Sequence, residues 1–176
     1  MAGWTLEQLE RGTRVFVDSS VLLYHFFRKS DQCRRFLRRC EAHDCFATTS
    51  VVVLFEVTHR LMAAEAVAAG LVPRGQAVRS LQQRPDVVRQ LHVHSAQAAE
   101  VATFGIEILP ADLGVCLRAG EFRERFGLLT NDSIIVATMR DAGVTAIATA
   151  DRDFERVEGI QVFRPTDLGT AAPALA

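Results

Sequence analysis

Short apolar runs alternate along the chain with longer stretches of mixed polarity, which is the pattern of a protein built from alternating strands and helices. Five of the runs have the length and the residue types of strands: residues 15–17, 45–47, 106–109, 144–149 and 160–163. The first run is apolar at every position, as expected for a strand that is buried on both faces of a parallel sheet. The pattern therefore predicts an α/β fold with a five-stranded parallel sheet flanked by helices.

The intervals between these runs show helical periodicity and the signals that start and end helices. Helices are predicted over residues 5–11, 20–27, 73–104 with a break at Pro85, and 111–126. An amphipathic helix is predicted from Ser30, and a long helix from the hydroxyl caps Thr48, Thr49 and Ser50 to about Ala69. A further helix is predicted to begin at Asn131 as its N-cap. No linker divides the chain, so we expect one domain over residues 14–168, an extension at residues 1–13 and a frayed tail at residues 169–176.

Composition narrows the class of protein. A chain of 176 residues with 49% hydrophobic residues can bury a substantial core. No apolar run approaches the roughly 20 residues of a membrane span, and the amino terminus lacks the layout of a signal peptide, so we expect a cytoplasmic protein with no membrane partner. The four cysteines contain no Cys-x-x-Cys pair, which favours free buried thiols in that compartment.

The formal net charge of −1 does not indicate a nucleic-acid-binding protein, so any basic surface must be local. One candidate is the helix that begins at Ser30, where four arginines share a face away from the apolar one: Arg34, Arg35, Arg38 and Arg39. Such a face is usually a solvated surface, and the alternative is a stripe that contacts nucleic-acid phosphates.

Four aspartates end a predicted strand or begin the helix that follows: Asp18, Asp132, Asp151 and Asp153. Because open α/β sheets keep their ligands at the carboxyl ends of the strands, we expect these side chains to meet there. A pair of carboxylates about 4 Å apart repels by on the order of 4 kcal/mol, so the cluster requires cations or protonation. Carboxylate ligands with retained waters suit Mg²⁺ or Mn²⁺, and such ions orient water for phosphodiester hydrolysis.

Glu56 is a fifth candidate, inside the predicted long helix and in a run that is apolar nearly all round. A charge in such a place is costly unless it has a partner. Glu56 either pairs with Arg60, four residues later, or points into a cavity and binds a cation.

Taken in order, four blocks resemble the PIN-domain family: residues 15–22 with Asp18, the lone Glu56 in its apolar helix, residues 128–138 with Asp132, and residues 147–157 with Asp151. The resemblance implies a PIN-like three-layer sandwich, and a metal-dependent ribonuclease site whose acids are these four residues. Asp153 matches a further acid that many members carry. Beside the acids, Ser20 would hold the Asp18 carboxylate by a hydrogen bond, and Asn131 is a second supporting candidate.

The resemblance also implies the partners of the protein. The substrate would be RNA, to which the arginine stripe is a candidate contact, and the cofactor would be Mg²⁺ or Mn²⁺. The role would be that of a VapC-type toxin with a small antitoxin, and we expect a homodimer. Residues 73–104 make the chain longer than compact toxin members, so an RNA-processing nuclease outside toxin systems is an open alternative. A non-catalytic PIN module that binds RNA or protein is another, although none of the acids is missing.

Two unrelated sites fit the sequence less well. A phosphatase of the haloacid dehalogenase kind needs a second aspartate two residues after Asp18, where this chain has Ser20. A zinc site has the ligand atoms but poor spacing, on Cys33, Cys40, His43 and Cys45.

Overall fold

The computed structural model describes residues 4–168, so the frayed tail predicted at residues 169–176 lies outside the described residues. Within the described range one sheet has six strands: β1 (Trp4–Thr5), β2 (Arg14–Val17), β3 (Phe46–Ser50), β4 (Glu107–Leu109), β5 (Ala146–Ala148) and β6 (Gln161–Arg164). Their order across the sheet is β1-β6-β5-β2-β3-β4, and every neighbouring pair is parallel. The predicted α/β fold with a parallel sheet is confirmed.

The sixth strand corrects the prediction of five. Trp4 pairs with Phe163 and Thr5 with Arg164, so part of the expected extension at residues 1–13 joins the edge of the sheet. Two residues are too few to show the alternation by which a strand is recognised in a sequence. The helix expected at residues 5–11 is a single 3-10 turn, η1 (Leu6–Gln8), whose Gln8 side chain accepts a hydrogen bond from the Thr5 N–H at 2.8 Å.

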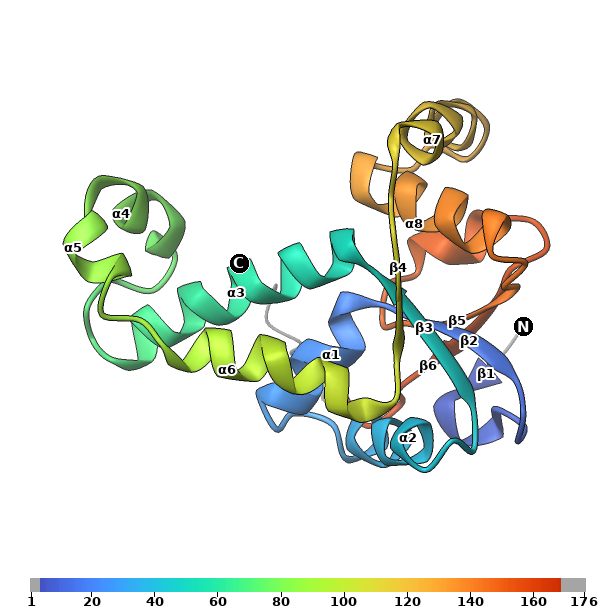
Figure 1. Ribbon diagram of the computed structural model, residues 1–176, viewed down its shortest axis with the longest axis horizontal. Helices are drawn as coiled ribbons and strands as arrows, with labels where there is room; N and C mark the ends of the chain where they lie inside the picture. Colours follow the sequence, from blue (N-terminus) through green and yellow to red (C-terminus); the bar gives the residue numbers. More distant parts are fainter. Residues whose placement is uncertain (1–3, 169–176) are drawn as a thin grey trace.

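The helices occupy the predicted intervals, with ends that differ by a few residues. They are α1 (Ser19–Phe26), α2 (Asp31–Glu41), α3 (Val51–Ala68), α4 (Ala77–Gln83), α5 (Pro85–Val88), α6 (Val93–Glu100), α7 (Leu113–Phe126) and α8 (Thr130–Asp141), with 3-10 turns η2 (Val101–Phe104) and η3 (Asp153–Arg156). Figure 1 shows α1 and α2 on one side of the sheet and α7 and α8 on the other, which gives the three-layer arrangement. Over residues 4–168, no helix has both the length and the apolar character needed to cross a bilayer.

Two predicted helix caps differ from the structure. Of the three hydroxyls before α3, only Ser50 is the cap, and its Oγ accepts a hydrogen bond from the Val53 N–H at 3.4 Å. The prediction of Asn131 as an N-cap is wrong, because α8 begins at Thr130 with Leu129 as its N-cap residue. A side-chain cap contributes only about 1 kcal/mol, so the burial of Leu128 just before the helix is sufficient to move its start.

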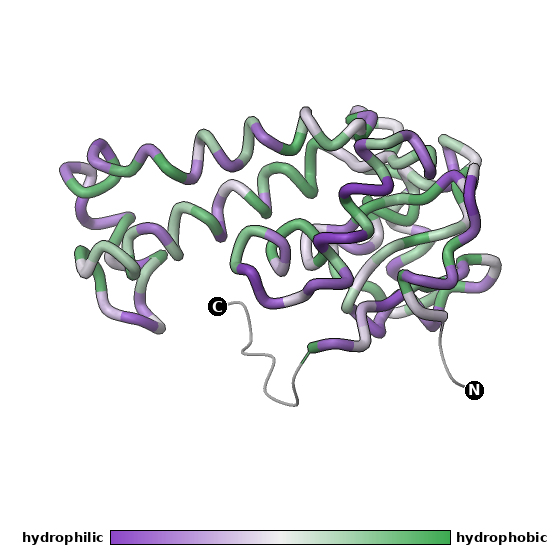
Figure 2. The backbone as a smooth tube through the Cα atoms, turned by 90° about the horizontal axis from the view of Figure 1, so that it is seen from below, coloured by the Kyte–Doolittle hydropathy of each residue, from purple (hydrophilic) through white to green (hydrophobic). Residues whose placement is uncertain are grey.

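A helical arm, which we define as residues 60–100, projects from the sheet. Within it, α3 and α6 lie side by side and α4 and α5 close the far end (Figure 1). Figure 2 shows the same projection after a turn of 90°. The arm has a small hydrophobic cluster of its own, which is separate from the main core and contains Ala66, Val72, Leu81, Val87 and Leu91. Because α4, α5 and α6 are short, their stability depends on packing and on polar contacts with α3.

Glu65 of α3 makes several of these polar contacts. Its carboxylate accepts hydrogen bonds from the N–H groups of His92 at 2.8 Å, Val93 at 3.0 Å and His94 at 2.9 Å, and the His94 Nδ1 lies 2.8 Å away. Burial acts to raise the pKa of Glu65, but these hydrogen bonds outweigh it and lower the pKa to about 2. The carboxylate therefore fixes the first turn of α6 to the side of α3.

Glu65→Gln should lower the free energy of unfolding by about 2 kcal/mol, because the N–H groups use both carboxylate oxygens as acceptors, whereas an amide has one acceptor oxygen and no charge. The depressed pKa also predicts that this contribution is present above the ordinary pKa of 4.5 and is lost as the pH falls toward about 2. Urea denaturation measures both effects. The exposed Glu121→Gln on α7 is the matched control, and equal stability of the two variants would show that the Glu65 contact contributes nothing.

Candidate metal centre

The order of the strands determines where the site lies. β2 is central, and the chain builds β3 and β4 on one side of it and β5 and β6 on the other. The switch point, at which the strand order reverses, therefore lies between β2 and β5. Open α/β sheets hold their ligands at such a point. Val17 pairs with Ala148, so the carboxyl ends of these two strands are level. Asp18 follows β2 directly and Asp151 follows β5 after a short loop, which brings both to this crevice.

Asp18 is the N-cap of α1 and its position is tightly restrained. Only 5% of the residue is exposed. Its Oδ2 accepts hydrogen bonds from the Ser20 Oγ at 2.6 Å and the Thr149 Oγ1 at 2.7 Å, and a longer one from the Ser20 N–H at 3.3 Å. The hydrogen bond expected from Ser20 is thus present in the structure.

Three aspartates, which we call the acidic trio, form the centre of the site: Asp132, Asp151 and Asp153. One carboxylate oxygen of each lies within 4.8 Å of the others, and among the described residues this is the one group of three or more potential metal ligands. Asp132 comes from the first turn of α8, whereas the other two come from the loop after β5. In that loop the Asp153 N–H donates to the Asp151 Oδ1 at 2.8 Å. A donor set of carboxylate oxygens, open to water, fits Mg²⁺ or Mn²⁺ better than it fits zinc.

Asp132 experiences the repulsion within this group. Burial, followed by the charges of its acidic neighbours, raises its pKa to about 6; those neighbours are Asp151, Asp18, Asp153 and Glu56. No hydrogen bond within residues 4–168 offsets this effect on the Asp132 carboxylate. The site is therefore electrostatically strained without a cation, and a bound cation would relieve the strain.

Glu56 and Asp18 lie beside the acidic trio and are not members of it. Both are near enough for their charges to raise the pKa of Asp132. Glu56 Oε1 lies 3.1 Å from the Arg60 Nε, and the Glu56 side chain is 24% exposed. The ion pair that was one of the two alternatives for Glu56 is therefore present, and the Glu56 charge acts on the site as well.

The raised pKa of Asp132 predicts that the metal-free protein loses stability as the pH rises. The unfolded carboxyl titrates near 3.8 and the folded one at about 6, so between these values the folded protein holds a proton that the unfolded chain has lost. The free energy of unfolding should fall by about 1–2 kcal/mol between about pH 4 and pH 7, after allowance for solvent screening. Denaturation across this range, with chelator present, measures the effect. Asp132→Asn should lack this component, and identical profiles for the two proteins would contradict the assignment.

The arginine face of α2 is largely engaged in ion pairs. Arg34 lies 2.8 Å from Asp31, Arg35 lies 2.6 Å from Glu7, and Arg39 lies 2.8 Å from Asp44. Such pairs reduce the positive charge that the face presents to solvent. An RNA contact by Arg34, Arg35, Arg38 and Arg39 stays a prediction.

The alternative zinc site has no support in the geometry. Cys33, Cys40 and Cys45 are buried and free, while Cys116 is exposed and free. Burial raises the pKa of the Cys33 and Cys40 thiols to about 12, which keeps them in the neutral form that binds metals poorly. Within the part of the chain that the structure describes, no group of potential metal ligands includes a cysteine.

Thr149 is a site residue that sequence reasoning missed. Its buried hydroxyl donates to Asp18 and accepts the N–H of Asp151 at 2.9 Å, so it connects the two acids. It also lies 3.3 Å from the Ser20 Oγ. The available signal was a hydroxyl side chain at the end of a predicted strand, two residues before an acid.

Comparison with known proteins gives one family and one curated relative. The family model of the PIN domain matches residues 15–160. Ribonuclease VapC6 of Methanocaldococcus jannaschii is 37% identical over 59 residues, which are 34% of this chain and 39% of that protein. The match therefore spans less than half of the relative.

Solved structures with low sequence identity share the fold. VapBC2 from Rickettsia felis, bound to a DNA fragment from its promoter, aligns with a TM-score of 0.57 at 14% identity, over 87% of this chain and 99% of that one. VapC20 of Mycobacterium tuberculosis, a Sarcin-Ricin loop cleaving toxin, aligns with a TM-score of 0.56 at 18% identity, over 85% of this chain and 98% of that one. A toxin-antitoxin complex from Klebsiella pneumoniae aligns with a TM-score of 0.52 at 17% identity, over 83% of this chain and 94% of that one.

Proposed function

Because this chain belongs to the PIN-domain family, we propose that it is a metal-dependent endoribonuclease that hydrolyses phosphodiester bonds in RNA. The observation that carries the proposal is the acidic trio, with two further carboxylates beside it, at the switch point of the sheet. The partial match to a ribonuclease supports RNA as the substrate. The acids by themselves indicate phosphodiester chemistry with a hard cation.

The residues of the site would have different roles in this reaction. Bound Mg²⁺ or Mn²⁺ would supply the positive charge that acidifies a water and stabilises the leaving oxygen. Asp132, Asp151 and Asp153 would hold the cation, with Asp18 and Glu56 next to them. We propose Asp18, Glu56, Asp132 and Asp151 as the catalytic set, in which Ser20 and Thr149 fix the orientation of Asp18 and Arg60 restrains Glu56.

A metal-dependence assay on a mixed pool of single-stranded RNA tests this proposal. We expect cleavage with Mg²⁺ or Mn²⁺, loss of cleavage with chelator, and recovery when the metal is restored. A DNA pool of the same sequences is the matched substrate control. Cleavage that persists in chelator would contradict the metal role, and no RNA cleavage with either metal would favour the alternative of a non-catalytic module.

We further propose that the protein is the toxin of a toxin-antitoxin pair, acts in the cytoplasm and forms a homodimer. The shared fold with toxins of such pairs supports this role. Expression of the wild type should arrest growth, expression of Asp132→Asn should not, and a small protein encoded next to the gene should relieve the arrest. Growth that continues normally while the protein cleaves RNA in vitro would instead favour an RNA-processing nuclease.

A further inference from the structure

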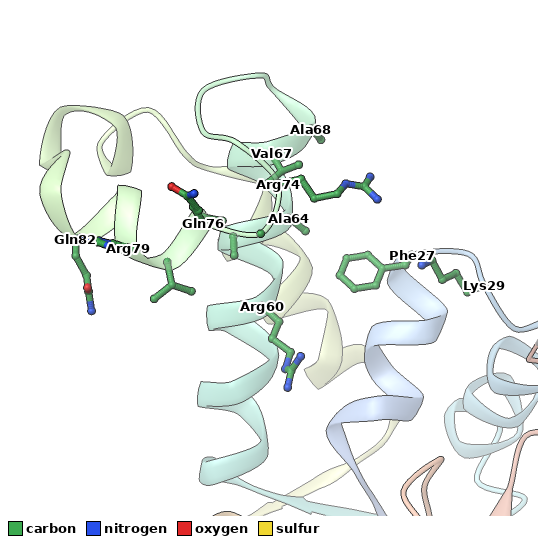
Figure 3. A pocket seen from close by; sticks show the side chains of 14 residues that line it. Phe27, Lys29, Arg60, Ala64, Val67, Ala68, Arg74, Gln76, Arg79 and Gln82 are labelled. Atoms are coloured by element: carbon green, nitrogen blue, oxygen red, sulfur yellow. The ribbon is translucent and has the colours of Figure 1, made fainter. Parts of the chain in front are cut away.

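A hollow of about 1010 Å³ opens between the end of α1, the outer half of α3 and the start of α4 (Figure 3). Its floor is one face of α3: Arg60, Ala63, Ala64, Val67 and Ala68. These residues are three or four positions apart, so they form a continuous stripe on the helix. Glu56 begins the same stripe one turn earlier, next to the acidic trio. The hollow therefore lies on the same face of α3 as Glu56, farther along the helix.

Four basic residues line the hollow, and no acidic residue does: Lys29, Arg60, Arg74 and Arg79. In the part of the chain that the structure describes, Lys29, Arg74 and Arg79 form no ion pair. The Arg60 Nη1 is buried and has no hydrogen-bond partner among those residues. A cleft lined by charge of one sign concentrates ligands of the opposite sign, so the ligand of this hollow should be an anion.

An aromatic ring lies at the rim of the hollow. Figure 3 shows Phe27 and Lys29, which follow α1, across the hollow from Arg60 and Arg74. Proteins that bind single-stranded nucleic acid combine such a basic groove, which contacts the phosphates, with aromatic side chains on which bases stack. The small side chains of Ala64 and Ala68 on the floor leave room for a polymer backbone to approach α3.

We propose that the hollow binds the single-stranded RNA segment next to the bond that is cut, with Lys29, Arg74 and Arg79 on its phosphates and Phe27 on a base. This inference rests on the proposed ribonuclease function. From Glu56 to Ala68 the helix rises about 18 Å, a length that matches about five nucleotides stacked at roughly 3.4 Å each.

An acidic protein segment would also satisfy the charge of the hollow. The position of the hollow favours RNA, because a substrate strand must occupy both the acids and the surface that continues from them. A protein partner has no such requirement. The shared face of α3 from Glu56 to Ala68 is what a strand that reaches both places would require.

RNA binding by a charge-removing double variant tests the proposal. In an Asp132→Asn background, which prevents cleavage, R74Q/R79Q should weaken the affinity for a labelled single-stranded RNA about tenfold and reduce the slope of log K against log salt by about 1.4, or roughly 0.7 for each phosphate contact. Phe27→Leu should weaken binding about fivefold to tenfold without changing the slope. R14Q/R89Q removes two exposed arginines outside the hollow and should change neither quantity.

Each result has a defined meaning if thermal unfolding shows that the variants are folded. Wild-type affinity and slope for R74Q/R79Q would overturn the proposal. The proposal would also be overturned if R74Q/R79Q no longer bound an oligo-glutamate peptide but still bound RNA as the wild type does. That result would assign the hollow to an acidic protein partner. Failure of the proposed function is distinguishable, because the protein with Asp132 intact would then cleave no RNA with Mg²⁺ or Mn²⁺.

Discussion

Asp132→Asn should abolish RNA cleavage and leave the fold intact. Asp132 is the member of the acidic trio that α8 contributes, and its amide analogue loses the charge that holds a divalent cation. Loss of a residue outside the ligand shell of a metal commonly costs roughly 10–100-fold in activity, so loss of a direct ligand should exceed about 100-fold. Initial rates on a single-stranded RNA with Mg²⁺ or Mn²⁺ measure the effect.

The same variant should make the metal-free protein more stable by about 1–2 kcal/mol, because it removes one of several mutually repelling charges. Wild-type protein should in turn be stabilised by Mn²⁺, by about 2.7 kcal/mol at a concentration 100 times its Kd, and Asp132→Asn should respond far less. Asp141→Asn, at the exposed far end of α8, is the control. Wild-type cleavage by Asp132→Asn would remove Asp132 from the proposed site.

Asp18→Ala should abolish cleavage and also destabilise the protein, in contrast to Asp132→Asn. Asp18 caps α1 and accepts hydrogen bonds from Ser20 and Thr149 in a nearly dry environment. Its removal loses a helix cap and leaves the Thr149 hydroxyl without its acceptor. Together these losses should lower the free energy of unfolding by about 2–4 kcal/mol, less the small gain from reduced repulsion.

Asp18→Asn separates the two consequences. The amide oxygen can still accept from Ser20 and Thr149, so the stability should stay close to that of the wild type while cleavage is lost. Urea denaturation and initial cleavage rates on the three proteins give the comparison. Equal stability of Asp18→Ala and the wild type would show that the hydrogen bonds around this carboxylate have no structural role.

Much of the architecture was predictable because each of the five expected strands contains a short apolar run. The run that became β2 is buried at Val15, Phe16 and Val17, as expected of a strand covered on both faces. The edge strand β1 escaped prediction because its two residues gain their conformation from pairing with β6, a contact that no local pattern records. The start of α8 was misplaced for a related reason, since burial of Leu128 outweighed the capping preference of Asn131.

The sequence by itself determined the order of strands and helices and the acids that follow the strands, because hydrophobic period and residue type are local properties of the chain. Only the tertiary structure decided which acids converge. It placed Asp132, Asp151 and Asp153 within 4.8 Å of one another and left Asp18 and Glu56 beside them. It also joined Thr149 to Asp18 and formed the basic hollow along α3. These relations depend on strand order and helix packing, which bring together residues that are distant in the chain, such as Asp18 and Thr149, 131 positions apart.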